Sequence, residues 1–145
     1  MIRMTIEEYR KLKKPMPSKY RNVRTERNLG NGKTLKFDSQ KEAVRYDELT
    51  FMLQSGDIRN LRLQPQFTLH EAYTTPDGER IQAMRYVADF SYEKRVGEYA
   101  TPGGESSPKW TLVVEDVKST ATKTQAYKLK KKLMLESLSI GITEI

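Results

Sequence analysis

Helical spacing of apolar and polar positions predicts two long helices. The first is expected from Ser39 to about Ser55, with Ser39 and Glu42 as a capping box and Gly56 as its stop. Residues four, seven and eleven positions apart lie at nearly the same angle on a helix, so one side should face the core. That side carries Glu42, Tyr46, Leu49 and Leu53.

The second helix is predicted to begin at Thr122 or Lys123 and to run to about Ser139, with Gly141 as its stop. Its apolar positions recur at helical spacing and should form the inner stripe. They are Ala126, Leu129 and Leu133.

Alternation with a period of two predicts strands around these helices. Two short strands flank the turn Gly30-Asn31-Gly32, which is typical of a β-hairpin. A tight turn is expected at Asp77-Gly78, a strand edge or bulge at Pro65, and a loop from Val96 to Lys109. The predicted strands are Tyr20–Glu26, Thr34–Phe37, Leu61–Tyr73, Glu79–Tyr92, Trp110–Lys118 and Ile142–Ile145.

This order of elements predicts an α/β (α+β) fold with a central mixed sheet flanked by helices. From Ser39 the order is α-β-β-β-α-β. We expect one domain over residues 19–145, including a basic hairpin at 19–37. Residues 1–18, with a short helix to Lys14, should form an N-terminal helix or arm.

The strand that ends in Asp116-Val117-Lys118 carries the most informative polar pair. Residues two positions apart share one face of a strand, so Asp116 and Lys118 should point the same way. A carboxylate and an ammonium at the end of a buried strand are costly unless they are used. Glu115 should point to the opposite face, although a one-residue bulge would exchange the two acids. The pair suits metal-assisted phosphodiester cleavage.

Two further carboxylates are candidates for the same site. Asp89 lies within an apolar strand, and on a strand beside Asp116 it could help to chelate a divalent ion. A lone strand aspartate more often accepts backbone hydrogen bonds at a sheet edge. Glu42 can serve as a helix cap or as a ligand that points at the sheet, and its spacing does not separate the two roles.

Composition narrows the choice of metal and partner. The chain has 145 residues, no cysteine, one histidine and a formal net charge of +7. Thiolate zinc sites and histidine-rich metal sites are therefore excluded, and carboxylate ligands point to Mg²⁺ or Mn²⁺. The positive charge favours nucleic acid as the partner. No membrane-spanning run or signal-peptide core is visible, so a cytoplasmic location is expected.

Lysines and arginines gather in two segments that could contact phosphates. The helix that follows Lys118 has no acid before Leu135, which favours phosphate contact over an ordinary solvated face. The expected DNA-binding residues are Lys19, Arg21, Arg24 and Arg27 in the hairpin, and Lys123, Lys128, Lys130 and Lys131 in the helix.

The ordered set of motifs resembles the PD-(D/E)-x-K nuclease superfamily. The segments Lys19-Tyr20-Arg21-Asn22, Phe37 to Ala43, Leu63-Gln64-Pro65, Tyr86 to Phe90 and Val114 to Lys118 are similar to a phage family of small endonucleases. That family is related to Holliday-junction resolvases of the endonuclease I type. The resemblance implies that Asp89, Asp116 and Glu42 bind Mg²⁺ and that Lys118 positions the attacking water. Ala88 replaces the proline of the motif, and Asp116 stands where glutamate is common.

We therefore expect a Mg²⁺-dependent DNA endonuclease, selective for branched DNA and acting as a homodimer, because two symmetric nicks need two active sites. Mn²⁺ should be able to substitute. Two alternatives stay open: a phage nuclease for linear or nicked DNA without junction preference, and a non-catalytic DNA-binding protein that keeps the nuclease fold.

Overall fold

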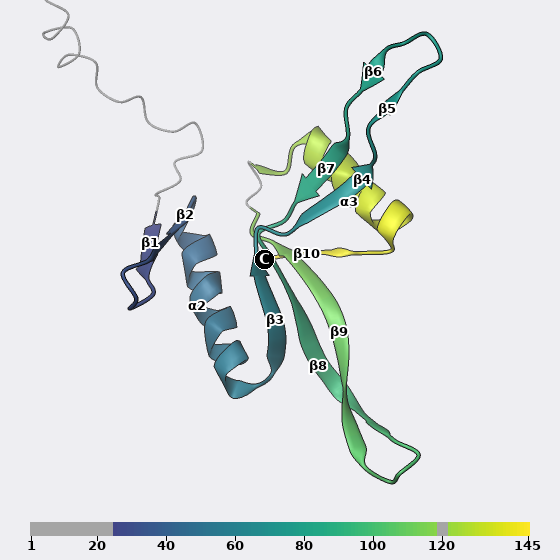
Figure 1. The fold of residues 1–145 in the computed structure, drawn as a ribbon. Coiled ribbons are helices and arrows are strands. Elements are labelled where there is room, and N and C mark those ends of the chain that lie inside the picture. The colour runs from purple at the N-terminus through teal and green to yellow at the C-terminus, as the bar shows by residue number, and fades with distance from the viewer. Residues whose placement is uncertain (1–24, 119–121) are drawn as a thin grey trace, which may run out of the picture.

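A four-stranded mixed sheet lies at the centre of the computed structural model, which describes residues 25–118 and 122–145 (Figure 1). Strand β8 is antiparallel to both of its neighbours, whereas the last strand runs parallel to β9. The prediction of a mixed α+β fold with a central mixed sheet is confirmed. The sheet order is β10 (Ile142–Glu144), β9 (Ser106–Asp116), β8 (Phe90–Ala100) and β3 (Ile58–Leu63).

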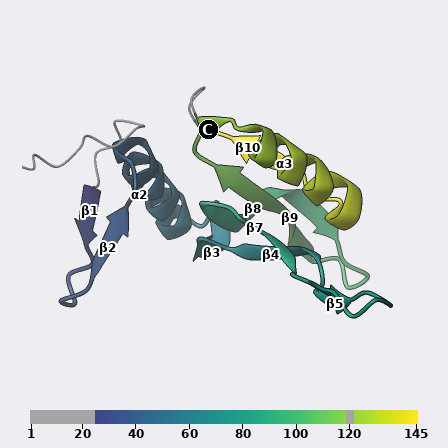
Figure 2. The ribbon, with the colours of Figure 1, turned by 90° about the horizontal axis from the view of Figure 1, so that it is seen from above.

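Helix α2 (Gln40–Ser55) covers one face of this sheet (Figure 2). The Ser39 side chain accepts a hydrogen bond from the Glu42 amide at 3.1 Å, and Gly56 ends the helix in the left-handed region at φ 83°. The hairpin of β1 (Thr25–Asn28) and β2 (Thr34–Phe37) packs beside the helix. The core on this face contains Phe37, Ala43, Leu49, Ile58, Phe90 and Tyr92.

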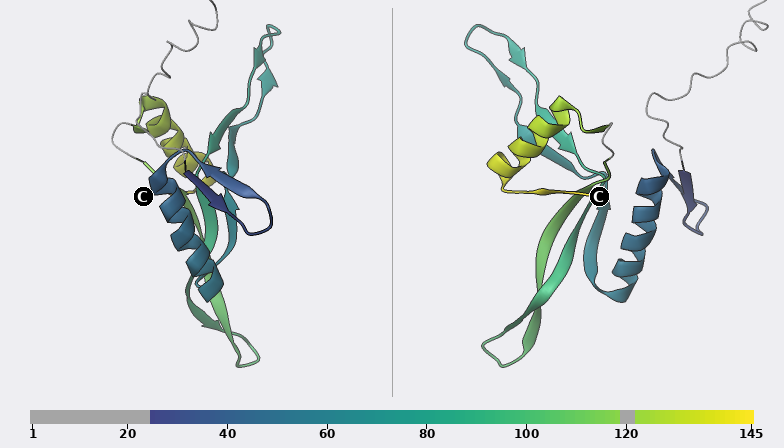
Figure 3. Two further views of the ribbon diagram at one scale, coloured as in Figure 1. Left: turned by 90° about the vertical axis from the view of Figure 1, so that its left-hand side faces the viewer. Right: turned by 180° about the vertical axis from the view of Figure 1, so that it is seen from behind.

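The opposite face carries helix α3 (Gln125–Leu138) and the antiparallel pair β4 (Gln66–His70) and β7 (Met84–Val87). The pair continues into the small outer hairpin of β5 (Tyr73–Thr74) and β6 (Arg80–Ile81), as Figure 3 shows. A separate core lies between these elements and the sheet. It contains Tyr86, Ala88, Val114, Tyr127, Met134 and Ile142.

Two predicted strands are each broken near the centre of the molecule. The strand expected from Leu61 to Tyr73 ends at Leu63 and resumes at Gln66, because Gln64 adopts φ 49° and Pro65 lacks an amide hydrogen. The strand expected from Glu79 to Tyr92 breaks around Asp89. The breaks face each other: the Gln64 amide donates to the Asp89 carbonyl at 2.9 Å. The chain therefore leaves the central sheet and pairs separately as β4 and β7.

The prediction of a loop from Val96 to Lys109 is wrong. Strands β8 and β9 stay paired as far as Ala100 and Ser106, and a short turn joins them. The Thr101 amide donates to the Glu105 carbonyl at 2.8 Å, so the Pro-Gly-rich residues form only the tip. We call residues 95–110 the arm, because β3 pairs with β8 only up to Lys94.

The buried side of α3 also differs from the prediction. Tyr127 and Met134 are buried, whereas Leu129 is 55% exposed, because the phase of the helix is set by the tyrosine that packs under it. On α2, Glu42 and Leu49 are buried as expected, but Leu53 is 40% exposed. The helix and arm predicted at residues 1–18 lie outside the described residues, as does most of the strand predicted at 20–26.

Candidate functional site

The two adjacent acids at the end of β9 point to opposite faces of the sheet, and both are only 1% exposed. Glu115 lies on the α2 side, where it accepts hydrogen bonds from Arg45 at 2.8 and 2.5 Å and from the Tyr92 hydroxyl at 2.5 Å. Its charge is thus fully matched by groups that hold the fold together. This arrangement makes Glu115 a structural residue and leaves Asp116 as the candidate site acid.

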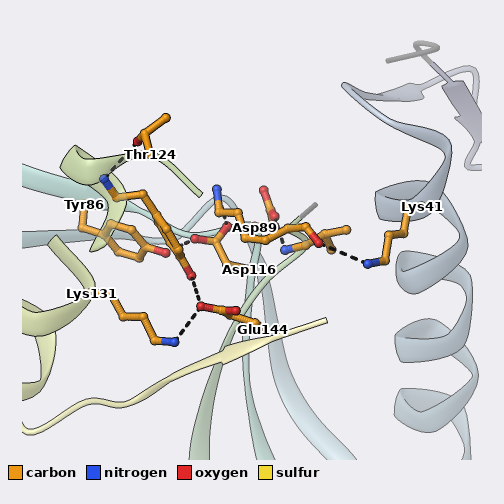
Figure 4. A network of polar contacts seen from close by, with 10 residues as sticks. Lys41, Tyr86, Asp89, Asp116, Thr124, Lys131 and Glu144 are labelled. Atoms are coloured by element: carbon orange, nitrogen blue, oxygen red, sulfur yellow. Dashed lines mark hydrogen bonds and ion pairs between the residues drawn. The ribbon is translucent and has the colours of Figure 1, made fainter. Parts of the chain in front are cut away.

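Asp116 lies on the α3 side next to Tyr86 (Figure 4), and Lys118 lies on the same side. The Tyr86 hydroxyl donates to one carboxylate oxygen of Asp116, and the Lys118 ammonium lies 3.5 Å from the other. Burial raises the pKa of Asp116, and the nearby lysine opposes that rise. The shared face predicted from strand spacing is therefore confirmed.

Asp89 lies at the break between β7 and β8, next to the end of β9. One carboxylate oxygen accepts a hydrogen bond from the Val117 amide at 2.6 Å, and the Asp89 amide donates to the Glu115 carbonyl at 3.1 Å. Burial raises the pKa of Asp89, while the Val117 amide and the Lys118 charge lower it. Its carboxylate is thus fixed at the end of β9, within electrostatic range of Lys118.

Glu42 approaches the same region from the first turn of α2 and is 8% exposed. Burial raises its pKa to about 7, with further contributions from the negative charges of Asp89, Asp38 and Asp116. The sequence prediction did not include Asp38 among the site residues. Its only signal was its place directly before the N-cap Ser39. Carboxylates from α2 and from the β-strands therefore repel one another here.

The carboxylates suit Mg²⁺ in kind, because oxygen donors are the ligands that this hard cation prefers. Within residues 25–118 and 122–145, however, no three acidic or histidine side chains converge closely enough to hold a metal ion. Both Asp116 oxygens have protein partners, Tyr86 and Lys118. The oxygen donors are therefore of the kind that Mg²⁺ prefers, but they are not arranged as a complete set of ligands around one point.

Tyr127 lies against Lys118 and in turn binds Glu144. The Lys118 ammonium lies 4.6 Å from the centre of the Tyr127 ring, and the Tyr127 hydroxyl donates to Glu144 at 3.1 Å. Glu144 is the β10 residue in register with Asp116. No sequence signal identified these contacts, because each depends on how β10 and α3 pack.

Glu144 also binds two of the lysines that were expected to contact DNA. Lys123 and Lys131 lie 2.7 and 2.6 Å from its carboxylate oxygens, and these bonds lower its pKa to about 2. By contrast, Lys128 and Lys130 have no carboxylate partner in the described part of the chain. The carboxylate of Glu144 therefore neutralises part of the positive charge on and beside α3.

Lys41 links α2 to the end of the sheet where Asp116 lies. The Lys41 ammonium donates to the Ile145 carbonyl at 2.6 Å and to the Lys118 carbonyl at 3.3 Å (Figure 4). These bonds hold the first turn of α2, and with it Glu42, against the strand ends. No sequence pattern indicated these two bonds.

Of the four hairpin residues that were expected to bind DNA, only Arg27 lies within the described residues. Its guanidinium forms an ion pair with Asp47 at 2.8 Å, so a phosphate would have to compete with that acid. Lys19, Arg21 and Arg24 lie outside the described residues.

A family model described as "Protein of unknown function (DUF1064)" matches residues 18–139. No curated protein and no solved structure matches the chain. In the part of the chain that the structure describes, no helix is long and apolar enough to cross a membrane.

Proposed function

The chain belongs to the DUF1064 family, and we propose that it is a Mg²⁺-dependent DNA endonuclease with a PD-(D/E)-x-K site on a restriction-endonuclease-like core. The observation that carries the proposal is the end of β9, where Asp116 and Lys118 share a buried face next to Asp89. Glu42 adds a fourth charged group from α2; burial is the main cause of its raised pKa, and excess negative charge from Asp89, Asp38 and Asp116 adds to it. Such excess charge favours the binding of a divalent cation.

Asp89, Asp116 and Glu42 are the residues that would hold the ion. When bound, Mg²⁺ supplies charge neutralisation at the phosphate. The Tyr86 hydroxyl orients the Asp116 carboxylate, and Lys118 would supply a positive charge beside it to the attacking water or to the phosphate. The lysine can hold the water by hydrogen bonding or neutralise a phosphate oxygen.

Selectivity for branched DNA is the sharpest form of the proposal. Phosphate contacts position DNA without reading its sequence. Among the described residues, the fold contains no separate module that could read the bases. A homodimer would supply two sites for paired nicks. A nuclease for linear or nicked DNA would use the same site without junction preference.

A non-catalytic DNA-binding protein is the second candidate. It is favoured by one observation: both Asp116 oxygens are engaged by Tyr86 and Lys118. That protein would retain the fold and the basic face of α3 and would bind DNA without cutting it.

Cleavage of end-labelled DNA separates these possibilities. A four-way junction, a flap and a linear duplex of matched sequence are incubated with the full chain in Mg²⁺, in Mn²⁺ or in EDTA. We expect the junction to be cut fastest, and only with the metal. Equal cleavage of junction and duplex would contradict junction selectivity, and no cleavage of any substrate would contradict the enzyme.

Asp116→Asn should lower the cleavage rate by about 100-fold or more, the size typical of losing one group that stabilises transition-state charge. DNA affinity should persist or rise, because a negative charge near phosphate is removed. Glu115→Gln is the matched control: it changes the adjacent acid in the same way, and its turnover per folded molecule should stay near that of the native chain. Unchanged turnover in Asp116→Asn would show that the wrong acid was assigned.

A further inference from the structure

The base of the arm contains a pocket of about 490 Å³ that lies away from the candidate cleavage site. It is lined by aromatic, basic and small polar side chains from β3, β8 and β9. Tyr99 is 57% exposed there, and Trp110 is only partly buried. Exposed aromatic rings beside basic groups are the elements with which proteins stack single-stranded bases.

Arg59 is fixed at this pocket by two contacts. Its guanidinium carbon lies 4.4 Å from the centre of the Trp110 ring, and its Nε donates to Glu93 at 2.6 Å. Glu93 also accepts a hydrogen bond from Asn60 at 2.8 Å, and these two bonds lower its pKa. The acid in the pocket is thus satisfied by its neighbours, while Lys109 has no carboxylate partner in the described residues.

The pocket is connected to the candidate site by the geometry of β9. Trp110 and Asp116 are six residues apart on one continuous strand, so they share a face. At about 3.3 Å per residue they are separated by roughly 20 Å. A nucleic-acid strand with a phosphate at Asp116 could therefore place a base at the arm within about six nucleotides, the count for a stacked strand at about 3.4 Å per nucleotide, and within fewer where the strand is extended.

We propose that this pocket binds an unstacked nucleobase of single-stranded DNA, with Tyr99, Trp110 and Arg59 as the stacking surface and Lys109 as a phosphate contact. The inference rests on the proposed function for the identity of the ligand. A base paired within a duplex has no free face to stack, so single-stranded segments are preferred. The pocket thus selects DNA that has an unpaired segment on one side of the cut.

Trp110 is the only tryptophan in the chain and reports on its own surroundings. The full chain is titrated in EDTA with a fluorescein-labelled twelve-nucleotide oligo-dT, and separately with a blunt-ended hairpin duplex. Tryptophan emission and fluorescein anisotropy are recorded on parallel samples. We expect oligo-dT to quench Trp110 along the same curve as the anisotropy, and the duplex to leave its emission nearly unchanged.

Tyr99→Ala should weaken oligo-dT binding about fivefold or more, in line with the loss of one stacking side chain. Tyr73→Ala is the matched control, because Tyr73 is also an exposed tyrosine on a hairpin, 47% exposed, but lies outside the pocket. Circular dichroism of each variant verifies that the strands are intact.

The proposal would be overturned by no binding of oligo-dT, by binding without a change in Trp110 emission, or by equal affinity in Tyr99→Ala and the native chain. Preferential quenching by the duplex would also contradict it. If oligo-dT quenches Trp110 but no DNA substrate is cleaved, the base-binding pocket is supported and only the proposed endonuclease activity is contradicted.

Discussion

Replacing Arg45 with methionine tests whether Glu115 is a structural acid. The change leaves the Glu115 carboxylate buried, at 1% exposure, with only the Tyr92 hydroxyl as a neutral donor. The two Arg45 bonds that it removes are 2.8 and 2.5 Å long. Methionine fills a similar length of side chain, so the main loss is the charge partner.

The structure sets the size of the expected effect. Breaking a buried ion pair by removing one partner costs about 3–5 kcal/mol. The Arg45 side chain remains 19% exposed and also contacts the more exposed Glu48, so the lower end of that range applies. We expect a loss of about 3 kcal/mol, which lowers the melting temperature by roughly 10 °C for a domain of this size.

Urea unfolding of the native chain, Arg45→Met and the double variant Arg45→Met with Glu115→Gln measures this loss. The double variant should recover about 2 kcal/mol, because it removes the unpaired charge and keeps an acceptor for Tyr92. A loss below about 1 kcal/mol in Arg45→Met, or no recovery in the double variant, would refute the structural role of Glu115.

Two further predictions concern Glu144. Glu144→Gln frees Lys123 and Lys131, so DNA affinity should rise and the slope of log affinity against log salt should steepen by up to about 1.8, whereas Glu136→Gln on α3, the helix of Lys131, should leave the slope unchanged. Equal slopes in the two variants would refute the competition between Glu144 and phosphate. Second, the lysines lower the pKa of Glu144 to about 2, so its stabilising effect should be complete above pH 4.5 and be lost as the pH falls toward 2. Acid unfolding curves of the native chain and Glu144→Gln should therefore converge at low pH, and a constant separation would contradict the assignment.

Local rules predicted the parts of the fold that depend on neighbouring residues. The Ser39 cap and the Gly56 stop of α2 follow from side-chain and backbone chemistry within one turn. The opposite directions of Glu115 and Asp116 follow from the pleat of a strand without a bulge. These features could be deduced because no distant contact is needed to produce them.

The predictions were wrong where contacts between residues far apart in the sequence determine the local structure. Strand pairing across the break places Gln64 against Asp89, and periodicity along the chain carries no record of that hydrogen bond. The arm contains Pro102 and Gly104, which indicate a turn but not that its flanking residues pair over their whole length. On α3, packing of Tyr127 against Tyr86 overrides the stripe that hydrophobicity alone suggested.

The groups of the site come from both layers that cover the sheet. Lys41 and Glu42 belong to α2, whereas Tyr86 and Tyr127 belong to the core on the opposite face. Asp116 lies at the end of β9 in the sheet between these layers, and the Lys41 bonds to the backbone at residues 118 and 145 link α2 to the ends of β9 and β10. Burial raises the pKa of Glu42 to about 7, and the negative charges of Asp89 and Asp116 add to that rise, so the acids of α2 and of the sheet interact electrostatically at this point.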